Sequence, residues 1–191
     1  MDKENTLYID LKDGRVVIEM RPDLAPKHVA QIKKLAREGK YDGVVFHRVI
    51  DGFMAQTGDP DGNGMGGMGD RLPAEFSKEP HSRGVTSMAR SSDPGSARSQ
   101  FFICFKDANF LDGQYTVWGK VTSGMEFVDK IKKGEPPSNP DKMVKVQVAA
   151  DANDYKVKGL PAGSPFSYSF VTVWNDLEMT CQRPSAFSRV R

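Results

Sequence analysis

The stretch FHRVIDGFMAQTGD, Phe46 to Asp59, is the most informative part of this sequence. It places an arginine, Arg48, shortly before the Asp51-Gly52 dipeptide, which is typical of a turn because glycine adopts positive φ angles at little cost. Apolar and amide side chains follow the turn: Phe53, Met54 and Gln56. The pattern predicts two short strands joined by the turn, with a permanently charged side chain on the first of them.

The segments around this stretch predict more short strands and two helices. A hairpin is expected around Asp13-Gly14, and helices are expected from Pro26 to Gly39 and from Met125 to Lys132. The other expected strands are Val44–Ile50, Phe53–Thr57, Val85–Arg90, Phe101–Phe105, Tyr115–Val121 and Val144–Val148. Many short strands with two helices indicate a closed or nearly closed β structure whose ends are covered by helices.

Length and composition are those of an ordinary globular protein: 191 residues, 38% hydrophobic and 27% charged. We expect one domain over residues 1–154 and an extension of unknown role over residues 155–191. Of the net charge of +2, the extension holds five basic against two acidic residues, which leaves −1 for the domain. That balance argues against nucleic-acid binding. We expect no signal peptide and no membrane span, and Cys104 and Cys181 fit a reducing cytoplasm.

Three further motifs follow in the chain: SMAR from Ser87, SQFFICF from Ser99 and FLDGQY from Phe110. Together with the Phe46–Asp59 stretch they resemble the cyclophilins, a family of peptidyl-prolyl cis/trans isomerases, over roughly Leu7 to Ala150. The resemblance implies a mainly β fold, a closed antiparallel eight-stranded β-barrel capped by two α-helices. It also implies an enzyme that isomerises X–Pro bonds and assists protein folding.

The chemistry of that reaction explains why an arginine would matter. Rotation about an X–Pro bond meets a barrier of about 18–20 kcal/mol because twisting breaks amide resonance. No covalent bond forms or breaks, so we expect no cofactor and no metal. The twisted amide nitrogen regains a lone pair, and a donor aimed at it favours the twisted state over both planar forms. The guanidinium of Arg48 has the fixed N–H donors for this role.

The resemblance implies a role for each motif residue. The catalytic residues would be Arg48, Phe53 and Gln56, with Gln56 bonded to the substrate backbone. The substrate-binding residues would be Met54, Ala89, Arg90, Phe102, Phe110, Leu111 and Tyr115. Among these, the main chain around Ala89 and Arg90 would anchor the residue before proline.

Three positions depart from many eukaryotic cyclophilins, since Phe110 replaces Trp, Tyr115 replaces His and Arg90 replaces Asn. We therefore expect weak cyclosporin binding. The expected partners are proline-containing peptides and unfolded or folding proteins, bound by a monomer.

Other functions remain open from the residues alone. A hydrolase would use His47 with Ser99 and an aspartate, but no G-x-S-x-G turn is present. A binding module or chaperone with incidental catalysis is a second alternative, and docking of the extension onto a partner is a third. The alternating aromatic residues from Phe166 to Trp174 would suit the third alternative, although we favour an extra edge strand or a poorly ordered tail as their interpretation.

The glycine-rich stretch DPDGNGMGGMGD, Asp59 to Asp70, matches three templates. Its acidic residues follow the opening of a calcium loop, and its glycine spacing follows a dinucleotide-binding turn. Both sites require flanking helices, which the neighbouring sequence does not predict. We interpret the stretch as a flexible wall of the substrate groove, similar to the glycine-rich loop of cyclophilins, and leave cation binding as the weaker alternative.

Overall fold

The computed structural model describes residues 1–152. The expected extension over residues 155–191, with its alternating aromatic side chains, lies outside the described residues. Eight strands, two α-helices and two 3-10 helices follow each other as β1 Thr6–Leu11, β2 Gly14–Met20, α1 Pro26–Arg37, β3 Arg48–Ile50, β4 Met54–Thr57, β5 Val85–Met88, η1 Pro94–Ser96, β6 Phe101–Cys104, η2 Asn109–Leu111, β7 Val117–Ser123, α2 Met125–Asp129 and β8 Lys145–Val148.

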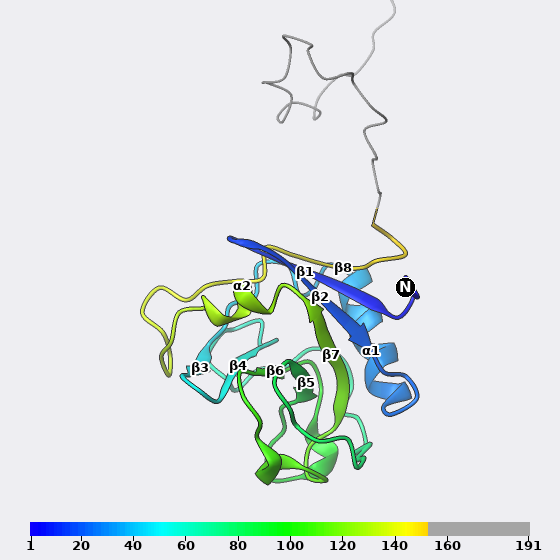
Figure 1. Cartoon of the computed structure of the whole chain (residues 1–191). Coiled ribbons are helices and arrows are strands. Elements are labelled where there is room, and N and C mark those ends of the chain that lie inside the picture. The colour runs from blue at the N-terminus through cyan, green and yellow to red at the C-terminus, as the bar shows by residue number, and fades with distance from the viewer. Residues whose placement is uncertain (153–191) are drawn as a thin grey trace, which may run out of the picture. The chain divides into compact units, whose positions relative to one another are not determined.

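All eight strands belong to one antiparallel sheet in the order β3-β4-β6-β5-β7-β2-β1-β8, and the sheet curls into a half-barrel (Figure 1). The prediction of eight antiparallel strands with two helices is confirmed. Closure is not: the described residues form no ladder between the edge strands β3 and β8. An isolated bridge from Val45 to Lys142 joins the segments that precede them. The fold is therefore an open half-barrel.

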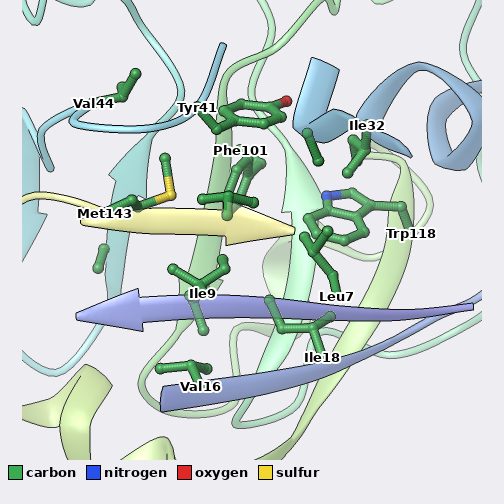
Figure 2. Close-up of a cluster of buried hydrophobic side chains, with 14 of the residues drawn as sticks. Leu7, Ile9, Val16, Ile18, Ile32, Tyr41, Val44, Phe101, Trp118 and Met143 are labelled. Carbon is green, nitrogen blue, oxygen red and sulfur yellow. The ribbon is translucent and has the colours of Figure 1, made fainter. Parts of the chain in front are cut away.

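The main core fills the inside of the curled sheet, where side chains of β1, β2, α1 and β8 meet (Figure 2). Phe101 lies between two buried aromatic rings, with its centroid 5.8 Å from that of Tyr41 and 5.2 Å from that of Trp118, both edge-to-face. Alternation along β6 sends Phe101 into this core and Phe102 into a second apolar cluster on the other face.

Helix α1 packs against the sheet through the face that its sequence spacing predicts, with Val29, Ile32 and Leu35 buried. The N-cap residue, Ala25, has no side chain that can accept a hydrogen bond from the first turn. Instead, the Glu75 carboxylate accepts hydrogen bonds from the backbone N–H groups of residues 27 and 28. The loop after the glycine-rich stretch is thus tied to the first turn of the helix.

Several expected elements are shorter than the sequence suggested, and two of them differ by three or more residues. β3 begins at Arg48 rather than Val44, because the backbone N–H groups of residues 43 and 46 donate to the carbonyls of residues 143 and 141 and not to the backbone of β4. α2 ends at Asp129 rather than Lys132, whose backbone N–H donates to the Asp141 carboxylate. Within residues 1–152, no helix is both long and apolar enough to cross a bilayer.

Candidate active site

A groove of about 820 Å³ lies against β3, β4 and β6, and all ten residues expected from the sequence line it. They are Arg48, Phe53, Met54, Gln56, Ala89, Arg90, Phe102, Phe110, Leu111 and Tyr115. Six more residues complete its lining: His47, Gly62, Asn63, Gly64, Glu135 and Pro136. The structure brings the expected residues together, although they come from four separate motifs.

Arg48 and Gln56 lie directly opposite each other in the β3–β4 ladder, which places both side chains on the same face of the sheet. The Arg48 side chain is 46% exposed, and its Nε donates a hydrogen bond to Glu135 Oε1 at 2.7 Å. Nε is the only guanidinium nitrogen that bonds to another described residue. Both Nη groups therefore remain available to a molecule in the groove.

An apolar floor lies beside this cation. Met54, Phe102 and Leu111 are buried in one cluster with Cys104 and Ala108. At the rim, the exposed ring of Phe110 lies 5.4 Å from that of Phe53, and Tyr115 meets Phe102 edge-to-face at 5.9 Å. A floor of this kind suits a small apolar ring, and the nearby polar groups can hold the chain on either side of it.

Gln56 is held in place by a chain of side-chain hydrogen bonds. Its Nε2 donates to Gln100 Oε1 at 2.9 Å, and Gln100 Nε2 donates to the carbonyls of Gly64 and Gly66 at 3.0 and 2.7 Å. The side-chain amide oxygen of Gln56, Oε1, accepts no hydrogen bond from a described residue, so it can accept from a molecule in the groove. Gln56 and the glycine-rich loop are therefore coupled through a single side chain.

The glycine-rich loop folds around the carboxylate of Asp59. This residue is fully buried, and its oxygens accept from the backbone N–H groups of Asp61 and Asn63 at 3.0 Å and of Gly64 at 2.6 Å. Burial raises the pKa of the Asp59 carboxyl, but these and neighbouring N–H donors outweigh burial and hold the pKa below its ordinary value. The loop lines the groove as expected, and these hydrogen bonds join its backbone to one carboxylate. Its flexibility stays a prediction.

A family model described as cyclophilin type peptidyl-prolyl cis-trans isomerase matches residues 6–149. The chain belongs to this family. A probable peptidyl-prolyl cis-trans isomerase of Brucella suis is 60% identical over 167 residues, covering 78% of this chain and 85% of the relative. Isomerase B of Bacillus subtilis is 46% identical over 134 residues, covering 68% of this chain and 92% of the relative.

Solved cyclophilins share the fold. A crystal structure of cyclophilin AquaCyp293 from Hirschia baltica superposes with a TM-score of 0.74 at 32% identity, covering 81% of this chain and 77% of the other. A Cryptosporidium parvum cyclophilin, crystallised in the presence of the dipeptide Ala-Pro, superposes with a TM-score of 0.70 at 28% identity, covering 75% and 98%. This chain is therefore a peptidyl-prolyl cis-trans isomerase of the cyclophilin type.

The surroundings of Ser99 and His47 argue against the hydrolase alternative. Ser99 is fully buried, and its hydroxyl donates to the Gly58 carbonyl at 2.7 Å and accepts from the Met68 N–H at 2.8 Å. Neither ring nitrogen of His47 is hydrogen-bonded to a described residue, and burial lowers its pKa. Residues 1–152 contain no group of three His, Cys, Asp or Glu side chains placed to hold a metal ion.

Two side chains that hold residues of the cyclophilin groove in place were not assigned this role from the sequence. Glu135 pairs with Arg48 because a bridge between Val49 and Gly134 brings the segment after α2 beside β3. Gln100 was named only as part of a motif, although it connects Gln56 to the loop. No spacing or periodicity signals the first contact, since its partners lie 87 residues apart.

Proposed function

We propose that Arg48 accelerates prolyl isomerisation by donating a hydrogen bond to the amide nitrogen in the twisted state. The observation that carries this proposal is the guanidinium beside the apolar floor, with Nε held by Glu135 and both Nη groups unbonded to described residues. The pyrrolidine ring would occupy the floor formed by Met54, Phe102 and Leu111. A donor that meets an acceptor only in the twisted state lowers the barrier rather than merely tightening binding.

Proline-containing peptides and folding polypeptides are the proposed substrates. The Ala-Pro dipeptide used with the Cryptosporidium relative supports this class of ligand. The side-chain amide oxygen of Gln56 would accept a hydrogen bond from a backbone N–H of the substrate. The main chain at Ala89 would anchor the residue before proline. Uncatalysed isomerisation takes about 10–100 s, so lowering the barrier by about 7 kcal/mol would give about a 10⁵-fold gain.

The test compares the full chain with Arg48→Ala and Arg48→Lys, using NMR exchange spectroscopy on a proline tetrapeptide. Loss of one transition-state donor is expected to reduce kcat/KM by about 10²–10³-fold in Arg48→Ala. Arg48→Lys keeps the charge but loses the planar donor pair, so it should recover little of the rate. Arg37→Ala is the matched control, because Arg37 lies on α1 and pairs there with Glu4. Equal rates for Arg48→Ala and the wild type would refute the mechanism.

We further propose that the enzyme assists protein folding in the cytoplasm. We also propose that residues 1–154 are sufficient for this activity. The catalysed step should shorten the proline-limited phase of a client's refolding, and truncation after Asp154 should leave that effect intact. A pure binding module would instead retard refolding at high enzyme concentration. The buried free thiol of Cys104 supports a reducing compartment, which cell fractionation with an antibody would test.

A further inference from the structure

A second pocket, of about 300 Å³, lies beside the proline groove and shares four lining residues with it: Gln56, Gly64, Ala89 and Arg90. We call it the arginine pocket, because Arg71, Arg90 and Arg98 all line it. Among the described residues that line it there is no aspartate or glutamate. The pocket therefore gathers three positive charges at one end of the groove.

These three arginines differ from the others in the described part of the chain. Residues 1–152 contain eight arginines, and five of them form ion pairs with carboxylates: Arg15, Arg21, Arg37, Arg48 and Arg83. The three without such a partner in residues 1–152 are those of the arginine pocket. Uncompensated cations on an otherwise nearly neutral domain create a local positive potential.

Neutral backbone groups hold two of these guanidinium groups in place. Arg90 donates through Nε and Nη2 to the Gln114 carbonyl at 3.0 and 2.8 Å and through Nη1 to the Ser91 carbonyl at 2.8 Å, and it stacks on the Tyr115 ring at 4.7 Å. Arg98 donates in the same way to the Gly69 carbonyl at 2.9 and 2.8 Å. Carbonyl oxygens orient a guanidinium without cancelling its charge. Both arginines are thus positioned to attract an anion at little further entropic cost.

Arg71 is exposed and forms no hydrogen bond or ion pair with another residue of the described chain. Its sequence neighbour Asp70 forms no ion pair with it and does not line the pocket, and the Glu75 carboxylate accepts from the N–H groups of residues 27 and 28. Two other acidic residues that flank the segments of the pocket bond to backbone groups. Asp59 accepts from backbone N–H groups inside the glycine-rich loop, and Asp93 accepts from the Gly95 N–H. The charge of the arginine pocket is therefore left for a ligand.

We propose that the arginine pocket binds the carboxylate of an Asp or Glu side chain that precedes the proline of a peptide substrate. This inference rests on the proposed function, because the two sites share Ala89 and Arg90, where the residue before proline would be anchored. A chain held there would pass its upstream side chains over the arginine pocket. The guanidinium of Arg71, which bonds to no described residue, can contact a carboxylate through two parallel N–H donors, while Arg90 and Arg98 add positive charge beside it.

The experiment uses matched pairs of proline tetrapeptides with Glu or Gln at the first or second position before proline. Isomerisation by the full chain is measured by NMR exchange in a phosphate-free buffer. In the wild type, the Glu peptide at one of these positions should have a kcat/KM about fivefold higher than its Gln partner, as expected for a partly exposed ion pair. The ratio should fall towards one in about 0.5 M salt, because salt screens such pairs.

Two substitutions test whether Arg71 is the cation that contacts the substrate carboxylate. Arg71→Gln should lower the Glu-to-Gln ratio, and Arg71→Glu should bring it to one or below. Because each ratio compares two peptides on one protein, a change in overall activity cancels. Lys34→Gln, which removes one charge from the exposed face of α1, should keep the wild-type ratio.

Equal treatment of Glu and Gln peptides at both positions by the wild type would overturn the inference, as would an unchanged ratio in Arg71→Glu. If none of the peptides is isomerised, the proposed function fails instead. NMR titration of the same peptides then tests the arginine pocket by affinity alone. Tighter binding of the Glu peptides would support the inference, and equal binding would refute it.

Discussion

Asp59→Asn tests whether one buried carboxylate builds the wall of the groove. One oxygen of Asp59 accepts from the Asp61 N–H, and the other accepts from Asn63 and Gly64. Asparagine has nearly the same shape, but one of its oxygens becomes an amide nitrogen, which only donates. At least one backbone N–H of the loop would then face another donor without an acceptor.

The expected loss follows from these contacts. A hydrogen bond to a charged group contributes about 1.5–3 kcal/mol, and an unsatisfied buried donor costs about 1–3 kcal/mol. Because one acceptor oxygen remains, we expect Asp59→Asn to lower the free energy of unfolding by about 2–4 kcal/mol. For a chain of this size that corresponds to a Tm decrease of about 5–15 °C.

The loss should depend on pH in a defined direction. The folded-state pKa of Asp59 lies below its ordinary value, so the carboxylate contributes stability above the unfolded pKa of about 4 and loses it as pH falls through the folded pKa. Asparagine does not titrate. The difference between wild type and variant should therefore be full at pH 6–8 and shrink below about pH 4.

Urea unfolding of the full chain at pH 7 and pH 3.5 measures both effects. Asp51→Asn is the matched control, because that side chain is exposed in the turn before Phe53, and it should change stability by less than about 0.5 kcal/mol. A variant Asp59→Asn as stable as this control at pH 7 would refute the role of the carboxylate. An equal loss at both pH values would show that charge is not its source.

Three further outcomes are expected. Glu135→Ala should lower kcat/KM about threefold by releasing the Arg48 guanidinium, while Glu135→Gln, which keeps an acceptor, should stay near wild type; faster exchange in the alanine variant would refute this. Burial raises the pKa of the Cys104 thiol to about 12, so in a Cys181→Ser background Ellman's reagent at pH 8 should label it only after unfolding, and rapid native labelling would contradict the burial. Cyclosporin should inhibit weakly because Phe110 lacks an indole N–H, and stoichiometric inhibition in a titration would overturn that expectation.

Local patterns predicted the elements well because their determinants lie close together in sequence. The Asp13-Gly14 dipeptide predicted the β1–β2 hairpin, although the turn is Lys12-Asp13, one residue earlier, because Gly14 pairs with Leu11. The helical spacing of Val29, Ile32 and Leu35 predicted the buried face of α1. Strand alternation alone separated Phe101 from Phe102. Each of these results follows from the backbone period of a single element.

The residues of the groove were found differently, through a resemblance of whole motifs. Periodicity alone would have placed Met54 in either cluster, and nothing in its neighbourhood separates a core methionine from a pocket methionine. Arg90 was expected to contribute its main chain to substrate binding, and its side chain was noted only as a substitution for Asn. Its place in the arginine pocket depends on Arg71 and Arg98, which lie on separate segments of the chain. Contacts of that kind are set by the tertiary fold, so the sequence pattern does not predict them.

In the glycine-rich loop, the spacing of a calcium site correctly located a carboxylate at the centre of a tight turn, but the partners of that carboxylate in the structure are backbone N–H groups. The calcium template found carboxylates in a tight loop, and Asp59 does sit at the centre of one. Its ligands, however, are backbone N–H groups, which glycine allows to converge because Gly62 and Gly64 adopt φ of 66° and 85°. A cation at those oxygens would have to displace three donors that already stabilise the charge. The same bonds fix the carbonyls that hold Gln100, and through it Gln56, so this carboxylate acts on the groove by shaping its wall.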